Sequence, residues 1–573
     1  MSGSEKRHLL FLVLFALLLR LYVFVATPVI GTDGYNWFDS ARCFAEGDFK
    51  AGFRHPVHPC YPILFAVFTK LLGDYEVAGK AVALVMGVLS IFPLYFFARG
   101  VFGHYAGLFA AFLLAVNPTH VRLSADIMSD TTSLFFFLGA IWLGWEAIKR
   151  GSWQWYAPAG VCVVLSYFTR AEGLALFVVM LPWFIFAAAN LPQARLADVQ
   201  GLKRHLLKRV VCVGLFIAPV ILLSVPYLLF IHKEKGSWHV TQQLAARFAT
   251  GHVKMTPILT GEDGRKPGER VHEQEKIARW KEKGHYHMIF LLVLNEFAKD
   301  FYQPLLPLLL IGLFRFASPP KVGKARLALH QNGTGLAGGP GTSEVSPYQR
   351  ITQGLPSLRL RLASSDSRGE FFMLSFFGLY FFLYYLFAYN AYYISGRYVL
   401  PMAVLSFVWA GAGVEKVSQW LCQVVPSLGR DTQGFNRAGL LILLALLVVV
   451  LPKDLKIKRK EEVVKKEVGY WLRTNSSIKR PVIVGMGSLD LEKVAFYAGG
   501  EFRHLSPAEY NIFQRFINEW KPDYIIFYNE ELPERVSGAV DKSTNFVFLK
   551  EWVCKRKGEE SHLRLYSVKG DSW

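Results

Sequence analysis

The sequence predicts a polytopic α-helical membrane protein that ends in a small soluble α/β domain. Of its 573 residues 52% are hydrophobic, and the mean hydropathy of +0.27 is too high for a soluble protein of this size. Apolar runs recur at the length that crosses a bilayer, roughly 20 residues of helix. Beyond residue 453 the composition becomes that of a soluble domain. We therefore place a membrane domain at residues 1–453 and an α/β domain at residues 454–573.

The first apolar run, residues 9–30, predicts an uncleaved helix with its N-terminus in the cytoplasm, because no small-residue cleavage site follows it. The loop 31–62 then becomes polar and aromatic. We expect this loop on the outer face. Part of it has the spacing of an amphipathic helix that lies in the membrane interface, given by Tyr35, Phe38, Ala41, Arg42 and Ala45.

The apolar runs predict about eleven spans in all. With the N-terminus inside, most Lys and Arg residues of the short loops fall on the inner side, as the positive-inside rule requires, and the C-terminal domain falls outside. The basic run from Lys453 to Lys466 counts against this topology. The predicted spans are residues 9–30, 77–97, 105–116, 131–148, 155–168, 174–189, 208–230, 297–316, 371–389, 398–414 and 440–451, and residues 62–72 are a re-entrant or interfacial element.

Two long inserts interrupt this pattern. Residues 232–296 are predicted to form an external loop, which either covers a substrate entrance or is simply solvated. Residues 317–369 are rich in Gly, Ser and Pro, which predicts a disordered cytoplasmic loop. No internal repeat is evident, which lowers the expectation of a secondary transporter.

The formal charge of +20 does not indicate a nucleic-acid partner, because no basic strip interleaved with aromatic residues is present. We attribute the charge to topology and to contact with anionic lipids. The six cysteines show no CxxC spacing, and Cys43 and Cys60 share one loop in which they could pair if that loop lies outside.

The C-terminal domain is predicted to contain strands at residues 482–484, 524–527 and 546–549, with helices at 491–497 and 508–520. The sequence Gly485-Met486-Gly487-Ser488 follows the first strand. It lacks the third glycine of a dinucleotide-binding loop, so a tight turn between strand and helix is favoured.

Unusual polar residues gather at helix ends on the predicted outer side. Each has an ordinary structural explanation: Asp33 and Asp130 as helix caps, Arg170 with Glu172 as a local ion pair, and Arg397 as a snorkelling anchor. Ionisable groups at membrane level are costly, however, and usually mark a substrate path. Their gathering on one face therefore predicts a functional site.

These residue types suggest a transfer reaction. A carboxylate can activate an acceptor hydroxyl or amine, and arginine suits a phosphate leaving group because its planar fork donates two parallel hydrogen bonds. A sugar linked to a lipid phosphate would meet both groups, with its lipid tail among the spans. Asp33 is the leading candidate for the base.

Several short motifs together resemble the GT-C superfamily of membrane glycosyltransferases, most closely the protein mannosyltransferase and aminoarabinose-transferase branch, which uses polyprenyl-phosphate sugars. The resemblance covers roughly residues 9–401, and order and spacing carry more weight than any single match. The motifs are Asp33 after the first span, His58-Pro59-Cys60-Tyr61-Pro62, Asn117-Pro118 followed by Ser129-Asp130, Thr169-Arg170-Ala171-Glu172-Gly173, and Arg397-Tyr398-Val399-Leu400-Pro401.

The resemblance implies residue roles. Asp33 matches the acid that orients or deprotonates the acceptor, and Asp130 matches a second acidic position, with Asp126 as its rival. His58 stands near the expected lipid phosphate, and Arg397 with Tyr398 matches a late Arg-Tyr element. We assign the donor phosphate to Arg397, Tyr398, His58, Arg170 and His55.

Metal dependence stays open at this point. Many members carry two adjacent acids where this chain has Asp33-Gly34, and a single carboxylate holds a divalent ion poorly. His55 and His58 could be ligands, but two prolines stiffen their loop and no nearby carboxylate completes a site. We therefore assign no metal and no other cofactor.

The sequence thus predicts an inverting glycosyltransferase that moves a sugar from a polyprenyl-phosphate donor to an extracytoplasmic glycan, lipid or protein. We expect it in a bacterial inner membrane, with the active site and the C-terminal domain on the outer face and no nucleic-acid partner. Two alternatives remain: a transporter or flippase for lipid-linked sugars, and an inactive subunit for envelope assembly. A transporter would distribute its charges through the spans, whereas these gather at one face.

Overall fold

The structure is a computed structural model. It describes residues 1–186, 199–236, 238, 267–317, 365–428, 437–505, 513–532, 534–556 and 559–569. Residues 239–266 of the predicted external loop 232–296 and almost all of the predicted loop 317–369 lie outside the described residues.

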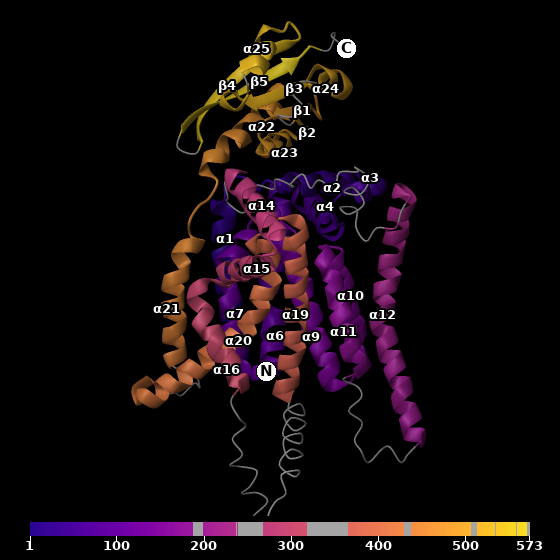
Figure 1. The fold of residues 1–573 in the computed structure, drawn as a ribbon, viewed down its shortest axis with the longest axis vertical. Coiled ribbons are helices and arrows are strands. Elements are labelled where there is room, and N and C mark those ends of the chain that lie inside the picture. The colour runs from indigo at the N-terminus through magenta and orange to yellow at the C-terminus, as the bar shows by residue number, and fades with distance from the viewer. Residues whose placement is uncertain are drawn as a thin grey trace, which may run out of the picture.

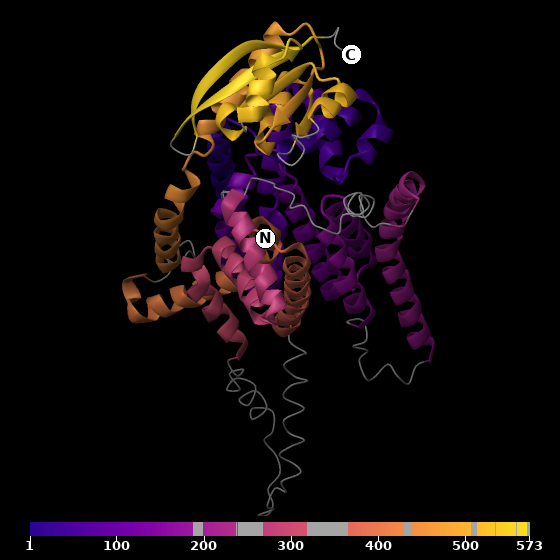
Figure 2. The same ribbon diagram turned by 45° about the horizontal axis from the view of Figure 1, so that its top comes forward.

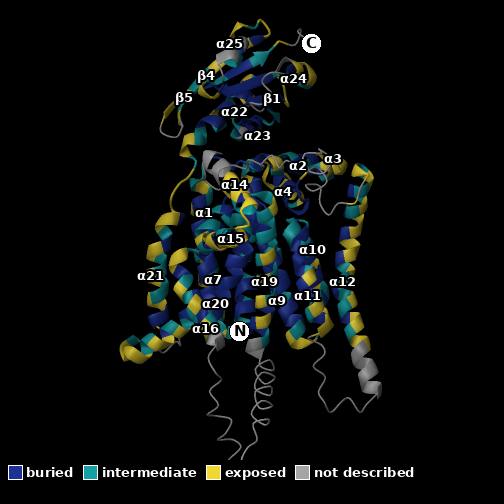
Figure 3. Cartoon of the chain, in the orientation of Figure 1, coloured by how far each residue is buried: buried dark blue, intermediate teal, exposed yellow. Residues whose placement is uncertain are grey.

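The described chain forms a bundle of helices with a sheet domain at one end (Figure 1). The N-terminus lies at the opposite end of the bundle, so α1 (Gly3–Ala26) runs toward the sheet domain, and Asp33 follows in the loop after α1. The bundle's outward faces are widely exposed while its centre is buried, as expected for helices that face lipid (Figure 3).

The remaining helices of the bundle and its loops follow in chain order. They are α2 (Gly34–Glu46), α3 (Phe49–Arg54), α4 (Cys60–Leu72), α5 (Tyr75–Leu89), α6 (Ile91–Phe102), α7 (His104–Ala115), α8 (Pro118–Leu123), α9 (Asp130–Arg150), α10 (Tyr156–Tyr167), α11 (Leu174–Phe186), α12 (Val199–Lys235), α14 (Pro267–Glu282), α15 (Tyr286–Phe301), α16 (Leu306–Ala317), α19 (Ser365–Ala391), α20 (Gly396–Val424) and α21 (Arg437–Asp454).

Within the described residues, six helical stretches are long and apolar enough to cross a membrane, and a bent pair makes a seventh. Shorter apolar helices of 10–17 residues, α4 and α7 among them, lie between these stretches. The prediction of a polytopic helical membrane protein is confirmed, whereas the count of about eleven spans stays a prediction.

The predicted continuous span 297–316 is wrong. The chain bends by 87° between α15 and α16, and Tyr302 at the break has a φ of 73°. Left-handed backbone at a bulky residue ends the helix there. The hydropathy of the run gives no sign of this break, because both halves are apolar.

The C-terminal domain holds a five-stranded mixed sheet in the order β2-β1-β3-β5-β4. β1 (Val482–Met486) pairs in parallel with β2 (Glu501–Leu505) and β3 (Tyr524–Tyr528), whereas β5 (Glu559–Val568) is antiparallel to β3 and β4 (Phe546–Arg556). The helices of this domain are α22 (Val463–Asn475), α23 (Glu492–Ala498), α24 (Phe513–Trp520) and α25 (Glu534–Lys542).

The small α/β domain is therefore confirmed, and β2 and β5 were missed because charged residues interrupt their alternation. The turn after β1 is tight, with Gly487 at φ 86°, as the sequence favours. The predicted boundary after residue 453 falls beside the end of α21 at Asp454 and stays a prediction.

The predicted amphipathic helix is present as α2, and its apolar stripe is covered by α4, α5 and the C-terminal domain together. Phe38 packs edge-on against Phe496 at 4.8 Å, and the Tyr35 hydroxyl accepts a hydrogen bond of 2.8 Å from the Phe502 amide. Figure 2 shows the sheet domain lying close to this part of the chain. Residue spacing identifies the apolar face of a helix but not whether lipid or protein covers it.

All six cysteines are free thiols, so Cys43 and Cys60 do not pair. Cys43 faces the His55 ring at 3.7 Å instead, and Cys60 is buried at the start of α4. Sharing a loop is not enough for a disulfide unless the two side chains also point at one another.

Candidate active site

Two ion pairs join the helix-end residues that the sequence singled out. Arg397 Nη1 donates to Asp33 Oδ2 at 2.6 Å, and Arg170 Nη1 donates to Asp130 Oδ1 at 2.7 Å. Arg170 also pairs with Glu172. We call these five residues the ion-pair cluster. They come from loops separated by as many as 364 positions in the chain, so the cluster is a product of the tertiary fold.

The ring of Tyr398 holds the two arginines together. The Arg170 guanidinium lies 5.2 Å from the ring centroid and that of Arg397 lies 5.4 Å from it, within the range of a cation–π contact. The two guanidinium groups carry like charges and would otherwise repel one another. The aromatic face and the carboxylates thus fix both guanidinium groups in one orientation.

Asp33 does not act as a helix cap. It occupies the N-cap position of α2, but its side chain makes no capping hydrogen bond and turns to Arg397 instead. Its side chain is 14% exposed, compared with 4% for Asp130 and 3% for Asp126. Of these three acids, Asp33 is therefore the most accessible to a ligand.

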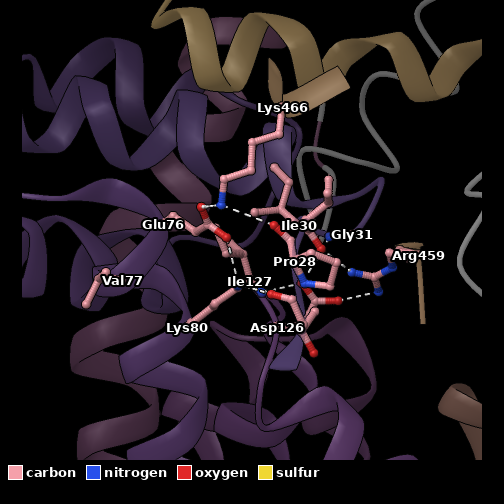
Figure 4. A network of polar contacts seen from close by, with 12 residues as sticks. Pro28, Ile30, Gly31, Glu76, Val77, Lys80, Asp126, Ile127, Arg459 and Lys466 are labelled. Atoms are coloured by element: carbon pink, nitrogen blue, oxygen red, sulfur yellow. Dashed lines mark hydrogen bonds and ion pairs between the residues drawn. The ribbon is translucent and has the colours of Figure 1, made fainter. Parts of the chain in front are cut away.

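Asp126 is held in place by three donors. Arg459 pairs with Oδ2, and the amides of Gly31 and Ile127 each donate to Oδ1 at 2.9 Å (Figure 4). Burial alone would raise the pKa of this carboxyl, but the charge and hydrogen bonds of these donors outweigh it and hold the pKa at about 2. Asp126 is accordingly a structural anion.

The loop that carries Asp33 is clamped between the bundle and the C-terminal domain. Arg459 also donates to the Val29 carbonyl at 3.0 Å, and Lys466 donates to the Pro28 carbonyl at 3.1 Å (Figure 4). The Ile30 amide donates to the Tyr497 hydroxyl at 3.1 Å. Residues from the linker, α22 and α23 thus fix the backbone just before Asp33.

Arg459 adopts a strained backbone conformation to make these contacts. Its φ is 61°, a region that residues other than glycine seldom occupy. Such strain persists only where surrounding contacts hold it, and it is common at functional sites.

His58 lies beside the ion-pair cluster, where its ring meets Tyr167 edge-on at 6.1 Å. Burial lowers the pKa of His58 to about 4, while Glu172 opposes and Arg170 adds to this effect. His58 is therefore neutral at physiological pH. His55 lies elsewhere, 3.6 Å from Asp39 and near Cys43.

A polar cavity of about 270 Å³ adjoins the cluster. It lies between the end of α1, α8, the end of α15 and the linker after α21. This volume is just below the roughly 300–1,000 Å³ of a small-molecule site, which suits a headgroup or one sugar with its phosphate. The charged residues that line it are Arg122, Lys299, Arg397, Lys453, Lys456, Lys458 and Arg459, with Asp126, Glu296, Asp300 and Asp454.

The fold thus brings together Asp33, Asp130, Arg170, Arg397 and Tyr398, with His58 beside them. Sequence reasoning missed Arg459 and the lysines that line the cavity, although the basic run after residue 453 was the one feature that its topology could not explain. Among the described residues, no group of three His, Cys, Asp or Glu side chains is placed to hold a metal ion.

Comparison with known sequences points to glycosyltransferases. A family model described as dolichyl-phosphate-mannose-protein mannosyltransferase matches residues 54–231. The Bacillus subtilis (strain 168) protein YkcB, to which a mannosyltransferase function is assigned provisionally, is 29% identical over 132 residues. That match covers 22% of this chain and only 18% of YkcB.

Two solved structures cover nearly all of the chain. ArnT from Cupriavidus metallidurans, bound to undecaprenyl phosphate, matches with a TM-score of 0.53 at 13% identity over 98% of each chain. The apo oligosaccharyltransferase of Archaeoglobus fulgidus matches with a TM-score of 0.51 at 13% identity, over 92% of this chain and 70% of that one.

The chain has the GT-C fold. The resemblance drawn from the motifs is confirmed at this level, and its apolar helices together with the GT-C fold identify an integral membrane protein. Identities of 13% establish shared architecture, and function has to be argued from the site itself.

Proposed function

We propose that this GT-C protein is a glycosyltransferase that moves a sugar from a polyprenyl-phosphate donor to an acceptor outside the cytoplasm. The observation that carries the proposal is Asp33, a partly exposed carboxylate oriented by Arg397, because Arg397 also lines a cavity in which cations outnumber acids. ArnT, which shares the fold, was solved with undecaprenyl phosphate bound.

In the proposed reaction, the acceptor O–H or N–H attacks the anomeric carbon from the side opposite the phosphate. The bond from that carbon to the phosphate oxygen breaks, its electron pair leaves with the polyprenyl phosphate, and the acceptor proton passes to Asp33. A single displacement inverts the anomeric centre. Arg397 serves two purposes, because it orients Asp33 and also lines the cavity.

The other two acids have positioning roles in this proposal. Asp130 is nearly buried and neutralised by Arg170, and Asp126 is fixed by Arg459 and two amides. A carboxylate whose pKa is held at about 2 is a weak base, so Asp126 is ill suited to accept a proton. We propose that Arg170, Tyr398 and His58 help to position the donor. His55 lies elsewhere, so we no longer assign it to the donor phosphate.

We further infer that the site and the C-terminal domain face the outer side of a bacterial inner membrane. The end of α1 and the sheet domain lie at one end of the bundle, opposite the N-terminus (Figure 1). Asp33 of the ion-pair cluster follows α1, which supports a common side for the site and this domain. This arrangement also supports an enzyme over a transporter, which would place charged groups along the path to both sides.

Transfer from a panel of polyprenyl-phosphate sugars by the purified protein in lipid tests the proposal. Asp33→Asn keeps the shape and removes the base, so we expect the rate to fall at least about a hundredfold. Asp48→Asn is the matched control, because Asp48 caps α3 in the same loop and asparagine caps equally well. If donor moves across vesicles in both variants and no sugar reaches any acceptor, the transporter alternative holds.

A further inference from the structure

The cavity beside the ion-pair cluster is lined by seven cations and four acids. Three of its cations already have carboxylate partners: Arg397 with Asp33, Arg459 with Asp126, and Lys299 with Glu296. Among the other residues that line it, Lys453, Lys456 and Lys458 form no ion pair within the described chain, and the remaining acids are Asp300 and Asp454.

Three of these cations come from one short stretch of chain. Lys453 lies in the last turn of α21, and Lys456 and Lys458 follow in the linker to the C-terminal domain; we call the three the linker lysines. In the described chain, Lys456 and Lys458 make neither a hydrogen bond nor an ion pair, and Lys453 lies 4.9 Å from the ring centroid of Tyr302. Lys456 and Lys458 thus lack a direct counter-ion in the described chain, while the charge of Lys453 acts on Asp300 and Asp454.

The unfavourable electrostatic environment of the linker lysines lowers the pKa of Lys458. Burial lowers its pKa, and repulsion from Arg122, Arg459, Lys453 and Lys456 lowers it further, to about 8. An anion in the cavity would relieve this repulsion, since it faces the same cations.

We propose that the linker lysines bind the phosphate of the polyprenyl carrier in this cavity, a diester in the donor and a monoester once the sugar has left. The proposal rests on the proposed function, in which the phosphate belongs to the polyprenyl carrier that leaves the sugar. Ammonium groups bind phosphate as mobile point charges, and they are available here, whereas Arg170 of the ion-pair cluster is already engaged by two carboxylates.

This assignment also explains why a basic run follows residue 453. In the topology predicted from the sequence these lysines fall on the side where positive charge is disfavoured. A phosphate held among them would connect α8, α21 and the linker, next to the point where Arg459 clamps the Asp33 loop.

Direct binding tests the site without requiring transfer. The probe is radiolabelled polyprenyl phosphate without sugar, bound to the full-length protein in nanodiscs of phosphatidylcholine, with phosphatidylglycerol and inorganic phosphate as competitors. We expect Lys456→Gln with Lys458→Gln to weaken binding at least about tenfold, and the corresponding double change to arginine to retain it. Lys460→Gln in the same linker does not line the cavity and should bind as wild type.

The outcomes separate the two proposals. Asp33→Asn should bind the probe like wild type, so intact binding with no transfer by any variant would refute the glycosyltransferase and leave the site standing. Competition by inorganic phosphate as well as by the lipid would assign the site to phosphate in general. Unchanged affinity in the double glutamine variant, verified as folded by its thermal transition, would refute the site.

Discussion

The ion-pair cluster and the linker lysines meet at one cavity, which is lined by Arg397 of the cluster and by all three lysines, but their charges are arranged differently. In the cluster two guanidinium groups meet three carboxylates, and an aromatic ring fixes their orientation. The linker lysines form no ion pair among the described residues, and burial, together with repulsion from the cations around it, lowers the pKa of Lys458. Carboxylates pair with both cations of the cluster, whereas Lys456 and Lys458 have no carboxylate partner in the described chain.

This difference indicates a division of labour. A neutralised, rigid cluster keeps its geometry when ligands enter and leave, which suits the orientation of a base. An unneutralised set of flexible cations is unfavourable by itself and becomes favourable when an anion arrives, which suits the binding of a charged substrate. Changes in the cluster should therefore affect kcat, and changes in the lysines should affect KM for the donor.

The largest effect should come from removing Arg397 from the cluster. Arg397→Gln releases Asp33 from its only ion-pair partner among the described residues, and a misplacement of about 1 Å can cost a hundredfold in rate, so we expect kcat to fall by about that factor. Arg397→Lys keeps the charge but not the fork and should recover part of the loss. Steady-state kinetics measures both. A raised KM with unchanged kcat would instead assign Arg397 to the phosphate.

A smaller effect should follow from loosening the clamp. Arg459→Gln breaks a nearly buried pair and leaves Asp126 undercompensated, which should destabilise the protein by about 3 kcal/mol and lower kcat about tenfold with little change in KM. Thermal unfolding in detergent measures the first effect and kinetics the second.

The control for the clamp is Arg54→Gln. Arg54 pairs with Glu234 at 2.7 Å, but its side chain is 53% exposed, so water replaces the lost contact. We expect neither stability nor kcat to change measurably. Equal losses in both variants would mean that Arg459 acts through charge in general and not through its position at the Asp33 loop.

The sequence was informative about this site where the signal was local. Asp33, Asp130, Arg170 and Arg397 stood out because ionisable groups at the ends of apolar runs are costly, and the fold does unite them. Their partners were not predictable, since the carboxylate that Arg397 binds lies 364 positions away. A sequence pattern predicts which face of a helix or strand is buried, whereas the residue that contacts this face is determined by tertiary packing.

The same limit explains what the sequence analysis missed elsewhere. The break at Tyr302 occurs within an apolar run that reads as one helix, and the β5 strand was obscured by its charged residues. Arg459 appeared as one member of a basic run, because nothing in its neighbourhood encodes the contacts with Val29 and Asp126 that give it a distinct role.

The smallest expected effect is a dependence on pH that belongs to the lysine side alone. Lys458, with a pKa of about 8, carries its charge below that pH and loses it above, so kcat/KM for the donor should fall a few-fold as the pH rises through about 8. Lys458→Arg keeps its charge throughout this range and should abolish the fall. Arg122, Arg459, Lys453 and Lys456 face this group, and the acids of the cavity are Asp126, Glu296, Asp300 and Asp454.

The ion-pair cluster should not show this dependence. Its cations are guanidinium groups, which stay protonated over the whole range, so Arg397→Gln should lower kcat/KM at every pH and leave the midpoint near 8 in place. A midpoint that persists in Lys458→Arg would assign the titration to another group. A midpoint that moves in Arg397→Gln would show that the two sides of the cavity are coupled, and that orientation of the base and binding of the phosphate are not separate tasks.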